Sequence, residues 1–383
     1  MVPAPYDADV ESSAVVTPPY VGGPLRLLPF RALMLAPSRV GDPSSARAFA
    51  RPYRDVAARL TRWQRQGRIT RDDEPALYLH EYTAGGITIR GLVGLLDVSR
   101  GATRADERAI LPHEGIYPAQ ADDLADRMAE MQLNPAPILL VHHGPAQLRA
   151  LLAGVQVRTP DHEFTDRAGQ RHRIWAIRDE TELAAIGAGL ADEKALIADG
   201  HHRYAAYLRL QKRSPGGPSD YGLAMLVDQE DTPLFLGAIH RVLSGTSLDD
   251  VRSAALAVGF AVRDTTEEEA VAALGPDHLA ATDGERWAVL TVTVPPDRTA
   301  VQLLHEQLVP ALPHGPRRTT YHHSVEEALG HAHPGTAVAV LMPAPLVDRV
   351  LRIVRDDRLL PEKATSFQPK PSLGVLIRSM HDG

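Results

Sequence analysis

Apolar residues recur along the chain with two different periods. Between Phe49 and Trp63 they step by three or four positions through Tyr53, Val56 and Leu60, which predicts an amphipathic helix. Residues 76–82 and 87–98 have the composition of strands and flank a glycine pair, so we expect them to form a hairpin. Helical and strand-like segments therefore follow one another already in the first hundred residues.

The same alternation continues to the end of the chain. Short apolar runs predict buried strands at 138–141, 195–198 and 337–342. Residues 221–228 and 233–239 are expected to pair with each other through a turn at Glu230-Asp231. Strands that alternate with helices in both halves predict an α/β fold with mixed sheets, flanking helices and two subdomains.

Proline-rich and Ser-Gly stretches suggest where one domain ends and the next begins. Residues 1–24 are proline-rich and aperiodic, which predicts an extended N-terminal arm. Ser244-Gly245 has the composition of a linker, and the helix–strand pattern restarts after it. We therefore expect an N-terminal domain over residues 25–243 and a C-terminal α/β domain over residues 246–383.

The composition of the chain counts against several classes of partner and binding site. Hydrophobic residues make up 44% of the 383 positions and charged residues 23%, as in globular proteins. The net charge of −7 counts against nucleic-acid and anionic-membrane partners, because both attract basic surfaces. The chain has no cysteine, which excludes disulfides and thiolate metal sites. With no long apolar run and no signal peptide, we expect a cytoplasmic protein, and a homo-oligomer stays open.

Candidate chemistry gathers after the apolar run 195–198, in the stretch 199–203. The run breaks at Asp199-Gly200 and a helical pattern follows, so Gly200 lies where the backbone must turn sharply. His201, His202 and Arg203 then fall on the first helical turn, where free N–H groups and the helix dipole attract anions such as phosphate. Asp199 is suited to hold a metal ion or take a proton. The alternative is a helix cap followed by surface side chains.

Two further segments carry candidate residues. Glu114 stands between His113 and a glycine on a loop bounded by proline, where a carboxylate could act as a general base; the alternative is a solvated loop residue. Lys363, Thr365 and Lys370 lie in a proline-stiffened segment, residues 361–370, that precedes an apolar run. We call residues 361–370 the closing segment. It is suited to fold back onto the first domain as a phosphate clamp, and the alternative is a solvated tail.

Residues 199–203 resemble the D-G-H-H-R box of a prokaryotic family catalogued as a domain of unknown function, number ten-fifteen. Further segments are similar to that family's motifs, so the resemblance covers most of the chain: residues 29–33, 75–78, 91–94, 112–114, 321–324 and 361–370. The box alone is also similar to the phosphate-binding box of free-serine kinases in the ParB/sulfiredoxin superfamily. In those kinases an aromatic residue lines the substrate site, which makes Trp175 a candidate, although a tryptophan near a strand end is usually core packing.

Together these observations predict nucleotide-dependent phosphoryl transfer, from ATP or ADP with Mg²⁺, to a hydroxyl of a small metabolite. A free amino acid such as serine is one such acceptor. The predicted catalytic residues are Glu114, Asp199 and His202, and Asp199 is also the predicted Mg²⁺ ligand. The predicted nucleotide-binding residues are Gly200, His201, Arg203, Lys363, Thr365 and Lys370. The predicted substrate-binding residues are His113, Trp175, Tyr321 and His322.

Two other functions remain open at this point. One is a metal-dependent phosphoester hydrolase that uses the same residues with water in place of the hydroxyl. The other is a non-catalytic nucleotide-binding regulatory module. Three His-His pairs, at 142/143, 201/202 and 322/323, also leave open a transition-metal site to which each pair contributes one ligand.

Overall fold

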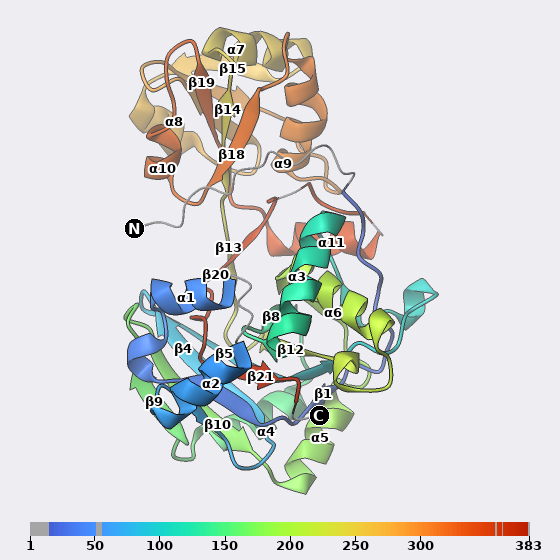
Figure 1. Cartoon of the computed structure of the whole chain (residues 1–383). Helices are drawn as coiled ribbons and strands as arrows, with labels where there is room; N and C mark the ends of the chain where they lie inside the picture. The colour runs from blue at the N-terminus through green and yellow to red at the C-terminus, as the bar shows by residue number, and fades with distance from the viewer. Residues whose placement is uncertain (1–14, 51–55, 357, 362, 382–383) are drawn as a thin grey trace.

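A computed structural model describes residues 15–50, 56–356, 358–361 and 363–381. The chain forms two lobes, drawn one above the other in Figure 1. The lower lobe contains a nine-stranded sheet and the upper lobe a six-stranded sheet. The predicted α/β class with mixed sheets, flanking helices and two subdomains is confirmed. The domain boundaries themselves stay predictions, and the first 14 residues of the predicted arm lie outside the described residues.

The nine-stranded sheet is mixed. Only β6–β11 and β8–β12 run parallel, and the other neighbours are antiparallel. Its order is β6 (Ile110–Leu111), β11 (Ala195–Asp199), β8 (Ile138–His142), β12 (Tyr221–Asp228), β5 (Ile87–Asp97), β4 (Leu77–Ala84), β10 (Arg171–Ile177) and β9 (His162–Thr165), and β1 (Leu27–Leu28) also pairs with β5. The predicted hairpin of residues 76–82 and 87–98 corresponds to β4 and β5.

Four helices contribute buried apolar side chains to one face of this sheet: α3 (Pro118–Met131), α4 (Ala146–Gln156), α5 (Glu180–Leu190) and α6 (His201–Arg213). Tyr204 and Tyr207 of α6 are buried in this layer. Tyr207 packs where Gly222 of β12 has no side chain, and its hydroxyl donates to the carbonyl oxygen of Leu223 at 3.1 Å. This contact fixes α6 against the sheet.

Two smaller sheets pack against the other face. One has the order β3 (Ile69–Arg71), β2 (Ala32–Leu35), β21 (Ile377–Ser379), β7 (Leu133–Asn134). The other pairs β13 (Phe235–Gly237) with β20 (Ser366–Gln368). The predicted pairing of 221–228 with 233–239 is therefore wrong, because β12 inserts between β5 and β8 while β13 takes a partner from the closing segment.

The six-stranded sheet of the upper lobe is antiparallel throughout. Its order is β15 (Ala261–Thr265), β17 (Trp287–Thr291), β16 (His278–Thr282), β19 (Ala337–Leu341), β14 (His240–Ser244) and β18 (Arg318–His322). Around it lie α7 (Leu248–Ala257), α8 (Glu267–Ala273), α9 (Ala300–Leu303) and α10 (Val325–Leu329). The change of sheet comes at β14, whose last residue, Ser244, was predicted to belong to the linker Ser244-Gly245; it pairs with Arg318 and Ala337 instead.

Three α-helices remain among the described residues, besides short 3-10 and π helices. The helix predicted from Phe49 to Trp63 falls on α1 (Pro43–Ala50) and α2 (Val56–Arg65), and the Phe49 and Trp63 rings meet edge to face at 6.3 Å. Tyr53, which the prediction also used, lies outside the described residues. The third helix, α11 (Val347–Arg355), lies between the lobes (Figure 1). Within the described ranges, no helix combines the length and apolar character needed to cross a bilayer.

The contact between Tyr207 and Gly222 gives a direct test of how α6 is positioned. A Cβ at residue 222 would lie 2.1 Å from Cδ2 of Tyr207, so Gly222→Ala forces the helix away from the sheet. We expect the substitution to lower the free energy of unfolding by about 1–3 kcal/mol. Gly187→Ala in α5 is the matched control, since no heavy atom lies within 4 Å of its Cβ; it should stabilise by about 0.5–1 kcal/mol. Urea denaturation measures both, and an unchanged Gly222→Ala protein would contradict the packing.

Candidate functional site

Residues 199–203, the D-G-H-H-R box, form the predicted strand–turn–helix. Strand β11 ends at Asp199, and α6 begins at His201. Gly200 between them has φ +95°, a conformation that L side chains rarely adopt. A Cβ at this position would also lie 2.9 Å from Nη2 of Arg203. The turn therefore requires glycine both for its backbone and for the room that Arg203 occupies.

Arg203 and Lys370 hold the carboxylate of Asp199 from two sides. Nη2 of Arg203 donates to Oδ2 at 2.6 Å, and Nζ of Lys370 donates to Oδ1 at 2.5 Å. Arg203 is also fixed by the carbonyl oxygen of Pro137, which accepts from Nη1 at 2.6 Å. Burial alone would raise the pKa of Asp199, but the charges of Arg203 and Lys370 hold it below its ordinary value. Asp199 is therefore an ionised carboxylate.

The two imidazoles of the box hold the loop that carries Glu114. The backbone N–H of His113 donates to Nε2 of His201 at 3.3 Å, and that of Tyr117 donates to Nε2 of His202 at 3.1 Å. A ring nitrogen that accepts carries no proton, so both rings are neutral. Burial lowers the pKa of His201 to about 3 and also lowers that of His202. Adjacent histidines thus have a structural role, which the sequence analysis did not foresee.

Glu114 contacts the closing segment. Thr365 donates its backbone N–H and its hydroxyl to Oε1 of Glu114, each at 3.2 Å. Nε2 of His113 lies 2.6 Å from Oγ1 of Thr365 and 3.7 Å from Oε1 of Glu114. Burial alone would raise the pKa of Glu114, but the hydrogen bond to the His113 ring and the charge of Lys363 lower it to about 2. The site thus contains a second ionised carboxylate.

Both lobes fix the closing segment. In the upper lobe, the buried Arg241 of β14 donates from Nη2 to the carbonyl oxygen of Lys363 at 2.7 Å. Lys363 has φ +54°, which costs a non-glycine residue about 1–2 kcal/mol. In the lower lobe, the hydroxyl of Tyr82 donates to the carbonyl oxygen of Pro369 at 2.6 Å, and Nε2 of Gln170 donates to that of Lys370 at 3.1 Å. These bonds hold the Lys363 turn and Lys370 in place at the site.

The motif at residues 321–324 contacts the site through His323, which was not among the predicted site residues. His322 turns away and packs its ring against that of His331 at 4.8 Å, and Tyr321 lies 5.5 Å from the Arg241 guanidinium. His323 instead faces the closing segment, with Nδ1 3.3 Å from Oγ of Ser366. Burial and the charges of Lys370 and Lys363 lower its pKa. Alternation along an extended chain, with every second side chain on one face, is the signal that could have found His323.

Trp175 is not part of this site. Its side chain is 2% exposed in the core, and its Nε1 donates to the carbonyl oxygen of Arg158 at 2.9 Å. Strand β10, which carries it, lies five positions along the sheet from β11. That separation is about 24 Å at the usual strand spacing. The substrate-binding role predicted for Trp175 is therefore corrected to core packing.

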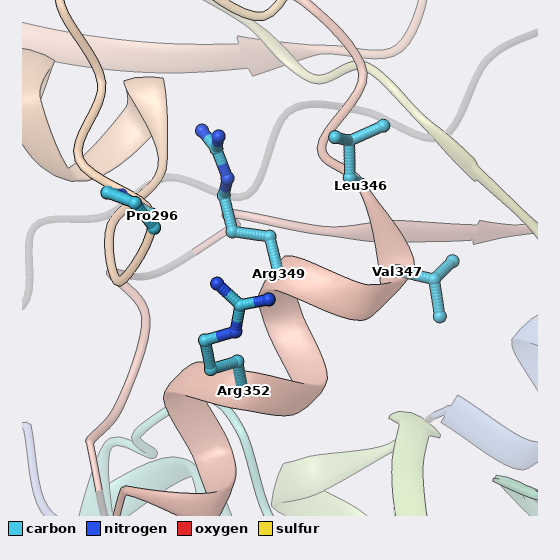
Figure 2. Close-up of a pocket in the computed structure, with 5 residues that line it drawn as sticks. All are labelled: Pro296, Leu346, Val347, Arg349 and Arg352. Atoms are coloured by element: carbon cyan, nitrogen blue, oxygen red, sulfur yellow. The ribbon is translucent and has the colours of Figure 1, made fainter.

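Neither a metal centre nor the cavity beside α11 adds residues to the site. Among the described residues, no group of three or more His, Asp or Glu side chains could hold a metal ion. A cavity of about 320 Å³ lies beside α11. Figure 2 shows that Arg349 and Arg352 extend from α11 toward the side on which the loop of Pro296 lies. None of the predicted site residues lines this cavity. The candidate site is therefore the box, the Glu114 loop, the closing segment and His323.

Comparison with known proteins identifies the family. The family model described as "Protein of unknown function (DUF1015)" matches residues 28–310, and the chain belongs to this family. The predicted family is thus confirmed, while membership of the ParB/sulfiredoxin superfamily stays a prediction. No curated protein matches the chain.

Several solved structures are similar to the chain. A conserved hypothetical protein from Pyrococcus furiosus has 16% identity and a TM-score of 0.38, over 72% of this chain and 94% of that one. A free serine kinase mutant in complex with ADP has 16% identity and a TM-score of 0.39, over 70% of this chain and 89% of that one. SbnI with a C-terminal truncation, from Staphylococcus aureus, has 11% identity and a TM-score of 0.41, over 75% of this chain and 87% of that one.

The neutral His201 predicts sensitivity to acid. The pKa of His201 is lowered from 6.5 to about 3 in the folded chain. Below pH 6.5 the unfolded chain therefore binds a proton that the folded chain does not, and stability falls as the pH drops toward 3. For this single group the loss between pH 8 and pH 5 is about 2 kcal/mol. His201→Gln, which keeps an acceptor but does not titrate, should lose that much less stability over the same interval.

Chemical denaturation at pH 8 and pH 5 measures this difference. His143→Gln is the matched control, because the His143 side chain is 48% exposed and lies outside the site. We expect the control to follow the wild-type pH dependence. Equal pH dependence in His201→Gln and the wild type would show that His201 is not held neutral.

Proposed function

We propose that the chain transfers a phosphoryl group from a nucleotide, ATP or ADP, to the hydroxyl of a small metabolite. One observation carries the proposal: ionised Asp199 and Glu114 meet Lys363 and Lys370 of the closing segment beside the N-terminus of α6. Among the described residues no side chain caps that N-terminus. Its N–H groups and dipole favour an anion, and the lysines match the charge of a phosphate chain.

The side chains of Arg203, Lys363 and Lys370 have different roles in this proposal. Arg203 uses Nη1 and Nη2 on Pro137 and Asp199, so it positions Asp199. Lys363 is exposed and has no ion pair within the described ranges, which leaves its ammonium available to a phosphate. Lys370 contacts Asp199 in this structure, and an arriving phosphate competes for it. The lysines neutralise charge on the transferring group, the largest contribution in this chemistry.

In this proposal Glu114 orients the acceptor hydroxyl. The acceptor oxygen forms a bond to phosphorus while the bond from phosphorus to the bridging oxygen of the nucleotide breaks. The nucleotide leaves with one phosphate fewer, as ADP from ATP or AMP from ADP, and the hydroxyl proton passes to solvent water. A carboxylate with a pKa of about 2 is a weak base at neutral pH. In a loose transition state, however, catalysis comes mainly from positioning and charge stabilisation, so an ionised hydrogen-bond acceptor suffices to orient the hydroxyl.

Asp199 is the residue that would hold Mg²⁺. Magnesium is usually bound through one or two carboxylates together with substrate phosphates, which fits a site without three protein ligands. A carboxylate has about four lone-pair positions, and Asp199 uses two of them on Arg203 and Lys370. When bound, the ion would neutralise charge on the phosphates.

A ligand and product screen tests the function. The full-length chain is mixed with ATP or ADP, with and without Mg²⁺, and with a panel of hydroxyl-bearing amino acids and their phosphorylated forms. Serine is the first acceptor, because the D-G-H-H-R box is similar to that of free-serine kinases. Nucleotide at a hundred times its Kd should stabilise the fold by about 2.7 kcal/mol, and one acceptor should be phosphorylated.

Other outcomes of the screen contradict the proposal. Nucleotide binding with no phosphorylated product for any acceptor favours a regulatory module. Release of phosphate from a phosphorylated amino acid without nucleotide favours a phosphoester hydrolase. Either result replaces the proposed function.

Glu114→Gln separates catalysis from binding. It keeps the shape of the side chain and an acceptor for Thr365 but removes the charge that orients the hydroxyl. We expect turnover to fall about ten- to hundredfold, because a charge-assisted hydrogen bond to the acceptor hydroxyl becomes a neutral one, while nucleotide affinity changes little. Glu107→Gln is a matched control, because Glu107 accepts from the N–H and the hydroxyl of Thr103 at 3.1 Å in the same way, outside the site. Equal loss of turnover and affinity would make Glu114 structural.

A further inference from the structure

A second group of polar side chains lies on the nine-stranded sheet, away from the candidate site. Strands β10, β4 and β5 are neighbours at the lower left of Figure 1, and their register places six polar residues in two cross-strand rows. The first row is Arg173, Glu81 and Arg90, and the second is Arg171, Thr83 and Thr88. These six residues and Gln156 of α4 line a cavity of about 400 Å³. We call it the arginine cavity.

Buried Glu81 organises the first row. Its side chain is 4% exposed and accepts from Nε and Nη2 of Arg90 at 3.1 and 2.9 Å. It also accepts from Nε of Arg173 at 2.7 Å and from Nε2 of Gln156 at 3.0 Å. One carboxylate thus holds two guanidinium planes in fixed orientations on rigid strands. Their remaining N–H groups are pre-organised for a ligand.

Open donors remain around the cavity. Nη1 of Arg173 and Nη1 of Arg171 have no hydrogen-bond partner in the portion of the chain described. The hydroxyls of Thr83 and Thr88 lie 2.9 Å apart and are accessible to solvent. The lining residues include three guanidinium groups and one carboxylate. Glu163 pairs with Arg171 and Asp231 pairs with Arg90 at the edge of the cavity. What the cavity offers a ligand is therefore the open Nη1 donors and the two hydroxyls, and not a net positive charge.

We propose that the arginine cavity binds a small phosphomonoester. Guanidinium groups recognise phosphate oxygens through paired N–H bonds, and hydroxyls complete such sites. The cavity lies at the small end of the range of ligand pockets, about 300–1,000 Å³, which suits a phosphate group with a short organic body. Its ligand is therefore a small phosphorylated metabolite.

The arginine cavity is a different site from the one at α6. The strands of the cavity, β5, β4 and β10, lie three, four and five positions along the sheet from β11, which is about 14 to 24 Å at the usual strand spacing. The cavity also contacts the loop that leads to β13: Nη1 of Arg90 donates to Oδ2 of Asp231 at 2.7 Å, and the backbone N–H of Arg90 donates to Oγ1 of Thr232 at 2.8 Å. Because β13 pairs with β20 of the closing segment, this loop connects the two sites. The binding proposal does not depend on the proposed function.

Isothermal titration calorimetry of the full-length chain tests the proposal, with glycerol phosphate and inorganic phosphate as ligands. Arg171→Ala removes a guanidinium whose Nη1 is open and whose Nε and Nη2 donate to Glu163. Its side chain is 62% exposed, so the fold should tolerate the change. We expect its affinity for glycerol phosphate to fall about ten- to hundredfold. Arg213→Ala, which removes an equal charge from an exposed ion pair on α6, is the matched control and should bind as the wild type.

Lys370→Met distinguishes the two sites. If glycerol phosphate binds in the arginine cavity, its affinity is unchanged in Lys370→Met and reduced in Arg171→Ala. The reverse pattern places phosphate binding at α6 and overturns the proposal. Absence of saturable binding to the wild type also overturns it, as does tighter binding of succinate than of glycerol phosphate. Thr88→Val, which removes one hydroxyl without changing charge, should weaken binding less than Arg171→Ala.

Discussion

The neutral state of two adjacent imidazoles is the constraint on which the candidate site depends. His201 and His202 each accept a backbone N–H from the loop before α3, and a protonated ring could not do so. Those two bonds fix a loop that has little regular structure of its own. Glu114 lies on that loop, so its position relative to α6 follows from the protonation state of the rings.

The closing segment then joins the two lobes at the same place. It contacts Glu114 through Thr365 and Asp199 through Lys370, and Arg241 of the upper lobe holds the turn at Lys363. Strand β20 extends this attachment by pairing with β13. Residues from four distant parts of the sequence thus surround the N-terminus of α6. A change in the relative position of the lobes would move both lysines with respect to both carboxylates.

Local patterns predicted much of the fold. The order of apolar and polar residues around residues 199–203 was enough to predict a strand, a turn at Gly200 and a helix. The positive φ of Gly200 explains why this position is glycine. The alternating segments of the first hairpin likewise became β4 and β5. The pairing of β13 with β20 was missed, because short strands with distant partners carry no local sign of register.

The functional interpretation of single residues was less predictable. The acceptor role of His201 depends on a residue 88 positions earlier, so the box alone could not show it. Trp175 has the same local pattern whether it lines a site or fills a core, and only its burial decides. His323 was missed because the motif drew attention to Tyr321 and His322, whereas the face of the strand selects alternate residues.

Hydrogen–deuterium exchange with and without Mg²⁺ and ATP tests most directly whether these segments form one nucleotide site. The account predicts slower exchange on nucleotide addition in three separate stretches: residues 113–117, the start of α6 and the closing segment. Exchange in the arginine cavity strands should stay unchanged in the same experiment. Protection confined to other regions, or no protection at saturating nucleotide, would contradict the assignment of this site to phosphoryl transfer.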